Sequence, residues 1–172
     1  MSIGRPSATL GTALLAALSG SVCLFQSGCD RADSPPGLTL RRDACSACGM
    51  TIEDEKSACA LRIQAASGPQ DLLFDDLGCL LDYQRDEGKN DVVQGVFVHD
   101  QQSGRWIPGQ AAWYVFGAGD RFQTPMSSGI AAFSTRAEAE RQKGTGVALN
   151  WDSLREARTR WMEEHFGKKG GN

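Results

Sequence analysis

The sequence has no excess of positive charge and no long uninterrupted apolar segment. Its 172 residues contain 18 Lys and Arg against 21 Asp and Glu, a formal net charge of −3 at pH 7. This balance argues against a nucleic-acid partner held through phosphate contacts. The apolar stretch near the N-terminus is shorter than the ~20 clean apolar residues that a membrane-spanning helix needs. The remaining composition predicts one globular domain or two small ones.

The patterns of common enzyme classes are also missing. No Ser-His-Asp set, Gly-rich phosphate loop or paired-carboxylate pattern stands out, so hydrolases and nucleotide-dependent enzymes have little support. Six cysteines are too few for a disulfide scaffold of this length, yet more than packing alone would usually place. Their spacing therefore has to be considered one cysteine at a time.

Residues 1–28 have the pattern of a lipoprotein signal peptide. Arg5 is the only charged residue before Asp30, and the segment between them is largely apolar, as in a signal peptide. Small residues directly before Cys29 resemble a bacterial lipoprotein cleavage box. We therefore expect Cys29 to be the acylated first residue of the mature chain. The alternatives are an uncleaved anchor and a secreted chain with a free Cys29, since Gln26 stands where such boxes usually carry Leu.

The segment that follows the acceptor cysteine predicts a tether. Residues 29–42 are rich in Pro, Gly and charge, a composition typical of linkers. Asp30, directly after Cys29, resembles the signal that keeps bacterial lipoproteins at the inner membrane. Acyl chains on Cys29 would hold the domain at the membrane surface without a spanning helix.

Hydrophobic patterning predicts two similar units in the mature chain. The first has strands near 59–64, 72–74 and 92–98, with a break at 67–69 and a helix capped by Asp75 before the third strand. The second has strands near 112–116, 129–133 and 146–149, with a helix over 135–143 capped by Ser134. We expect residues 59–64 to be half-buried, with Ala60, Arg62 and Gln64 on the outer face.

These elements predict an α+β fold of two small ββαβ-like subdomains packed together. The domain covers residues 43–150, with subdomains at about 43–100 and 106–150. Apolar residues then recur at helical spacing in 151–172, which predicts a C-terminal amphipathic helix and tail.

Three sulfur atoms lie close together in the sequence just after the tether. Cys45, Cys48 and Met50 fall within six residues, and Gly49 allows the backbone to fold back so that neighbouring sulfurs face one ion. Thiolate and thioether are soft ligands, which select Cu(I) over hard cations. If the two subdomains pack face to face, the loop before the 129–133 strand brings Met126 towards this segment as a third sulfur.

Each of these residues also has a structural alternative. Cys45 and Cys48 could form a disulfide or half of a zinc site, although no second CxxC or paired histidine accompanies them. Met50 and Met126 could fill gaps in the core. We expect Cys59 and Cys79 to be core thiols, with a disulfide between them left open. His99 ends a strand and is expected at the surface more than as a fourth ligand.

The order of several short motifs resembles the NosL family. The motifs are residues 48–50 after the lipobox and tether, 74–75 before a helix, 96–100, 112–115, and 124–126 ahead of 132–133. Members of this family are lipoproteins that accompany nitrous oxide reductase and are regarded as Cu(I) chaperones. The resemblance implies two ββαβ subdomains and copper ligation by Cys48 and Met50. Because some members keep only the later cysteine, Cys45 is left open as a ligand, a redox partner or a spectator.

The resemblance also implies partners and a location. The partners are nitrous oxide reductase and its membrane ABC-type maturation complex, and the site is the periplasmic face of the bacterial inner membrane. The predicted function is that of a lipid-anchored Cu(I) metallochaperone that is not an enzyme. Two rivals remain: a thioredoxin-like thiol-disulfide protein, and a scaffold lipoprotein that binds no metal. A thioredoxin-type CxxC opens a helix after an apolar strand, whereas charged residues precede Cys45 and Gly49 follows Cys48.

Overall fold

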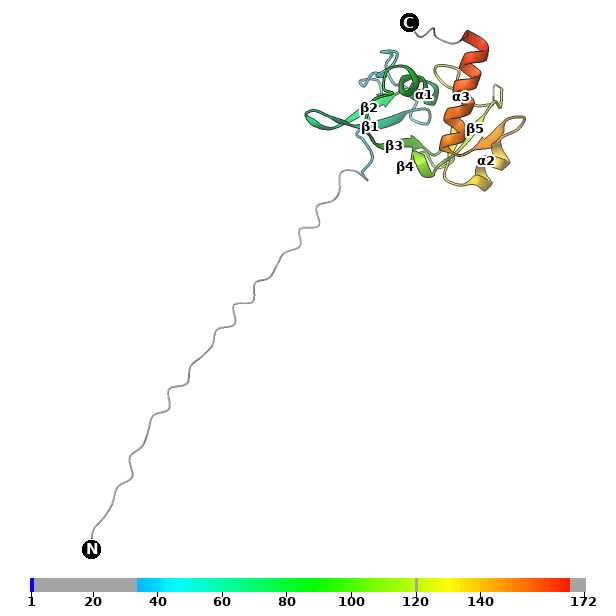
Figure 1. Cartoon of the computed structure of the whole chain (residues 1–172). Coiled ribbons are helices and arrows are strands. Elements are labelled where there is room, and N and C mark those ends of the chain that lie inside the picture. The colour runs from blue at the N-terminus through cyan, green and yellow to red at the C-terminus, as the bar shows by residue number, and fades with distance from the viewer. Residues whose placement is uncertain (2–33, 120, 168–172) are drawn as a thin grey trace.

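The computed structural model describes residues 34–119 and 121–167, together with Met1. The predicted signal peptide, Cys29 and most of the tether therefore lie outside the described residues. Within the described part, no helix has the length and apolar character needed to cross a membrane. Figure 1 shows two small sheets, with the long helix α3 running beside both units.

The first unit is a four-stranded antiparallel sheet with one helix. Its elements are β1 (Cys59–Ala65), β2 (Gly68–Phe74), α1 (Leu77–Asp86), β3 (Val93–His99) and β4 (Trp106–Pro108). The strand order is β2-β1-β3-β4. The turn of the β1–β2 hairpin is formed by Ala66 and Ser67. The predicted break at 67–69 is therefore correct only for Ser67, because Gly68 and Pro69 already pair with β1 as the first residues of β2. The predicted ββαβ order is confirmed.

Strand β1 is more buried than its alternating pattern predicted. Ala60 and Arg62 were expected on an outer face, but they are only 0% and 2% exposed. The reason is that the chain at Ser34 reaches this outer face, where the guanidinium of Arg62 donates to the carbonyl of Ser34 over 3.0 Å. Arg62 is accommodated by a 2.6 Å ion pair with Asp71 and by its guanidinium lying over the Phe97 ring. A buried charge that is paired and hydrogen-bonded in this way is tolerated.

The second unit repeats the order of the first on a smaller scale. A short 3-10 turn, η1 (Gly109–Ala111), leads into β5 (Trp113–Phe116), β6 (Ala131–Phe133), α2 (Arg136–Gln142) and β7 (Val147–Leu149). These three strands form a sheet in the order β6-β5-β7. The expectation of a second ββαβ unit is therefore confirmed.

Both helices begin one residue later than predicted. Asp76, not Asp75, caps α1 and accepts a hydrogen bond from the amide of Gly78. Thr135, not Ser134, caps α2 and accepts from the amide of Glu138. Because both helix starts are shifted by one residue, the two units still correspond at the corner where a strand ends and a helix begins. In the first unit it leaves the carboxylate of Asp75 free for other contacts.

The C-terminal helix α3 (Trp151–Phe166) joins the two units. Trp151 and Leu154 are buried in one hydrophobic cluster that draws residues from both sheets and from α1. Arg158 forms a 2.8 Å ion pair with Asp82 of α1. The two sheets also meet directly, because the amide of Gln101 donates to the carbonyl of Ala132 over 2.8 Å. The two units thus share one core.

Candidate metal centre

The sulfur-rich segment forms a tight hairpin. The amide of Cys45 donates to the carbonyl of Met50 over 2.8 Å, and the amide of Gly49 donates to the carbonyl of Cys45 over 2.9 Å. Gly49 has a φ of 75°, a left-handed conformation that glycine adopts without a steric penalty. Ala44 and Thr51 form a bridge below the turn. The glycine therefore has the role that the sequence predicted for it, which is to reverse the chain between Cys48 and Met50.

This hairpin packs against the corner where β2 ends and α1 begins. The amide of Ser46 donates to the carbonyl of Leu73 over 2.7 Å. Ile52, just past the turn, is fully buried and anchors the segment in the core. As a result, the thiol of Cys48 lies 3.8 Å from one carboxylate oxygen of Asp75.

Four side chains from these elements form a compact group of metal-ligating atoms. They are Cys45 and Cys48 of the hairpin, Asp75 of the corner and Cys79 on the first turn of α1. Their sulfur and oxygen atoms all lie within 4.8 Å of one another. Among the residues described here, this is the one cluster of three or more His, Cys, Asp or Glu side chains that could hold a metal ion.

Burial divides the group into an inner and an outer part. Cys45, Asp75 and Cys79 are 2%, 1% and 8% exposed, whereas Cys48 is exposed. An ion bound here would reach solvent beside Cys48. This arrangement suits a site that takes up and gives up an ion at one open side.

Hydrogen bonds among these groups differentiate the three thiols. Cys79 donates to the sulfur of Cys45, which lowers the pKa of Cys45 and raises that of Cys79. Burial raises the pKa of Cys48, and burial also raises the pKa of Asp75 to about 6. Cys45 is therefore the thiol of this group that ionises most readily, and the thiolate is the form that binds metals.

Asp75 and Cys79 were not recognised as site residues from the sequence. Asp75 was assigned as a helix cap and Cys79 as a core thiol. Once α1 is known to begin at Leu77, Cys79 falls on its first turn, where a side chain points back towards the helix N-terminus. Asp75 and Cys79 are four residues apart at the start of a predicted helix, a spacing that brings two side chains to the same side of the helix. This spacing was the signal that could have indicated their proximity.

The two predicted methionine ligands lie on segments whose backbones contact Cys45 and Asp76, and both side chains are partly exposed. Met50 is 47% and Met126 is 44% exposed. The amide of Met126 donates to Asp76 over 3.2 Å, and a Cβ atom added at Gly78 would lie 2.7 Å from the Cβ of Ser128. The loop that carries Met126 thus packs on the N-terminal end of α1. Ligation by either methionine stays a prediction.

The remaining cysteines and His99 differ from expectation in part. All four cysteines in the described part of the chain are free, so neither the 45–48 nor the 59–79 disulfide is formed. Cys59 is buried, as predicted, and has no place in the ligand group. The prediction of a surface position for His99 is wrong, because it is 2% exposed and its Nδ1 lies 2.9 Å from the carbonyl of Ala58. Its ring packs against that of Trp106, which lies opposite His99 on the neighbouring strand β4.

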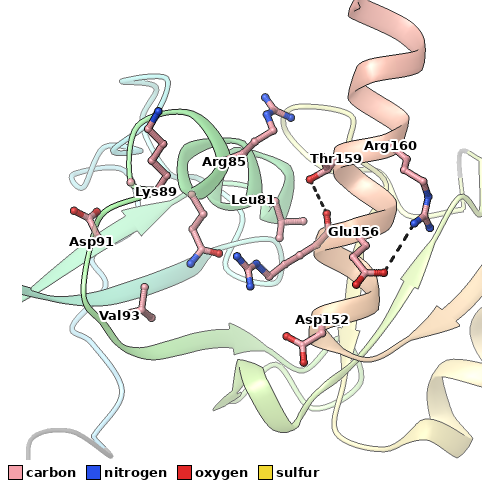
Figure 2. A pocket seen from close by; sticks show the side chains of 12 residues that line it. Leu81, Arg85, Lys89, Asp91, Val93, Asp152, Glu156, Thr159 and Arg160 are labelled. Carbon is pink, nitrogen blue, oxygen red and sulfur yellow. Dashed lines mark hydrogen bonds and ion pairs between the residues drawn. The ribbon is translucent and has the colours of Figure 1, made fainter. Parts of the chain in front are cut away.

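A separate cavity of about 850 Å³ lies between α1 and α3 (Figure 2). Its lining mixes basic side chains such as Arg85 and Lys89 with acidic ones such as Asp152 and Glu156. None of the four residues of the ligand group is among those that line it. The cavity is therefore distinct from the metal-ligating group.

The fold and the site together define a class of small protein: two ββαβ units sharing one core, with a thiol-rich group open to solvent on one side. The chain belongs to the NosL family, whose model matches residues 38–158. It also resembles the crystal structure of the copper chaperone NosL from Shewanella denitrificans, with a TM-score of 0.57 and 21% identity. That match covers 72% of this chain and 99% of the other. No curated protein matches the sequence.

Proposed function

We propose that this protein is a Cu(I) chaperone, which binds the ion and passes it to another protein without catalysing a reaction. The observation that carries the proposal is the group of three thiols and one carboxylate within 4.8 Å, with Cys48 exposed. Membership of the NosL family and the likeness to a structure described as a copper chaperone support the same function.

The chemistry of the ligands favours Cu(I). Thiolates and thioethers are soft ligands that select Cu(I) over Mg²⁺, Ca²⁺ or Mn²⁺. Cys48 and Met50 are both exposed, so a thiol of an acceptor can approach the ion before its bonds to this chain break. Transfer then proceeds by exchange of one ligand at a time, with copper remaining Cu(I) throughout.

The structure gives less support to the thioredoxin-like alternative. Cys45 and Cys48 lie in a hairpin closed by the bond from Cys45 to Met50, not at the start of a helix. A thioredoxin-type CxxC itself opens the helix whose N-terminus activates its first thiol, whereas the start of α1 meets this pair only by packing against the hairpin. The pair is therefore better suited to ligation than to disulfide exchange.

The location and the partner are also part of this proposal. The lipobox before Cys29 supports a lipid anchor on the periplasmic face of the inner membrane. Family membership supports delivery of copper to nitrous oxide reductase and its ABC-type maturation complex. Palmitate labelling of the full chain and of Cys29→Ser tests the anchor, and loss of labelling in the variant is the expected result. A membrane-free, unlabelled wild-type chain would contradict it.

Anaerobic titration of the full-length chain with Cu(I) tests the central proposal. Bathocuproine disulfonate serves as a competing chelator that reports the free ion. We expect one Cu(I) per chain to be withheld from the chelator, and no catalytic turnover in a disulfide-exchange assay. A wild-type chain that withholds no Cu(I), or that turns over disulfides, would overturn the proposal.

A further inference from the structure

The ligand group contains one thiol beyond the CxxC pair, and it comes from a different element. Cys79 lies on the first turn of α1, in contact with Cys45. Cys59 is equally buried in the same unit but does not join the group. Burial in the core does not by itself bring a cysteine into the group, because Cys59 is buried in the same hydrophobic cluster as Cys45 and Cys79 and lies outside the group.

The sulfur-bearing side chains at this site differ in how far they are buried. Cys45 and Cys79 are 2% and 8% exposed, while Cys48 is exposed and Met50 is 47% exposed. An ion held by the first two sulfurs is shielded from an approaching acceptor, and an ion held by the last two is accessible. Because the sulfurs of Cys45, Cys48 and Cys79 lie within 4.8 Å of one another, the ion can pass from the inner thiols to Cys48 by exchanging single ligands.

We propose that Cys79 is a Cu(I) ligand of this chain and that it forms, with Cys45, an inner thiol pair that slows release of the ion. Cys48 and Met50 form the outer side, from which copper is transferred. This inference rests on the proposed function. On binding, the Cys79 thiol gives its proton to the buffer as the Cu–S bond forms, and copper stays Cu(I), so no oxidant or reductant takes part.

The test compares Cys79→Ser with Cys59→Ser, a matched control that removes a buried thiol outside the group. Full-length wild type and both variants are titrated anaerobically with Cu(I) against bathocuproine disulfonate, and the rate of copper loss to excess chelator is followed by stopped flow. We expect Cys79→Ser to weaken affinity by about tenfold or more and to speed release, while Cys59→Ser matches the wild type. Equal affinities and release rates in the two variants would overturn the proposal.

A measurement on the wild type covers the case in which Cys79→Ser fails to fold. NMR of the ¹³Cβ atoms of labelled cysteines follows each thiol before and after one equivalent of Cu(I). We expect the Cys79 resonance to shift with those of Cys45 and Cys48, and that of Cys59 to stay. A change confined to the resonance of Cys48 would overturn the proposal that Cys45 and Cys79 form an inner pair of ligands.

Failure of this proposal and failure of the chaperone function give different results. If the wild type withholds no Cu(I), the function itself is wrong. If Cys48→Ser loses copper while Cys79→Ser behaves as Cys59→Ser does, the function stands and only the inner pair is wrong.

Discussion

The two units turn the same corner from strand to helix and use it differently. In the first, Phe74 ends β2, Asp75 follows, and Asp76 caps α1. In the second, Phe133 ends β6, Ser134 follows, and Thr135 caps α2. Asp75 is buried beside three thiols. Ser134 is exposed, and its amide donates to Asp100 over 2.9 Å.

The difference shows that the corner is a support and not itself a site. What distinguishes the first corner is the sulfur-rich hairpin docked on it through Ser46 and the thiol of Cys79 on the next helical turn. The loop carrying Met126 also comes from the second unit to the first corner. The repeated fold thus contains two equivalent corners, and the cluster of thiols lies at the first of them.

Removing the exposed thiol is expected to break this difference most strongly. Cys48→Ser replaces a soft sulfur ligand with a hydroxyl, so the first corner becomes nearly as poor in accessible ligands as the second. We expect Cu(I) affinity to fall by more than about 100-fold, as measured by anaerobic competition with a chelator. Cys59→Ser is the control and should keep wild-type affinity. Retained affinity in Cys48→Ser would show that Cys48 is not a copper ligand.

The helix caps give the next largest contrast. Asp76 is buried and accepts from the amides of Gly78 and Met126, whereas Thr135 is exposed and caps a shorter helix. We expect Asp76→Ala to lower the free energy of unfolding by about 2 kcal/mol and Thr135→Ala by about 1 kcal/mol or less. Urea denaturation of the copper-free chains measures both. Equal losses would show that the contact to the Met126 loop contributes nothing.

Giving the first corner the residue of the second tests what the carboxylate of Asp75 contributes to copper binding. Asp75→Ser gives the first unit the residue that the second unit has at this position, and it removes the oxygen next to Cys48. We expect Cu(I) affinity to fall by about tenfold with the fold intact. Ser134→Ala in the second corner should leave affinity unchanged. If both variants bind copper as the wild type does, Asp75 is not part of the metal site.

The smallest expected effect concerns pH. Burial lowers the pKa of His99 below its usual 6.5, so below about pH 6.5 the unfolded chain binds a proton that the folded chain does not. The contribution of His99 to the free energy of unfolding therefore falls as pH drops through this range. In His99→Gln this component should vanish, while Gln retains a donor for the carbonyl of Ala58. Urea midpoints between pH 7.5 and 5.5 measure it, and identical pH profiles would contradict it.

The sequence predicted the order of elements well because local patterns determine it. Alternating apolar residues and the break at 67–69 indicated the strands, and apolar residues at helical spacing indicated α3. The exact helix starts were missed, because Asp75 and Asp76, or Ser134 and Thr135, are both good caps and only the packing of the corner decides between them. The burial of Arg62 and His99 was missed because it depends on which distant segments pack against them.

Only the residues of the candidate site that are close together in the sequence could be predicted from it. Cys45, Cys48 and Met50 are adjacent in the sequence, so their chemistry could be recognised from spacing. Cys79 joins them through the docking of the hairpin on β2 and the first turn of α1, which is a tertiary contact with no local pattern. The approach of the Met126 loop was inferred from the repeat, and the structure places its backbone against Asp76.

Cys48 and Asp75 are 27 residues apart in the chain, so copper binding to this group would couple the ion to folding by mass action. An unfolded chain keeps only the local CxxC pair as a weak chelate, because Asp75 and Cys79 arrive with the fold. An ion that prefers the complete group stabilises the folded state by an amount that grows with the free ion concentration. The melting temperature then becomes a readout of copper occupancy. A chain that has handed over its ion is still held by its shared apolar core, and is less heat-resistant than the loaded one.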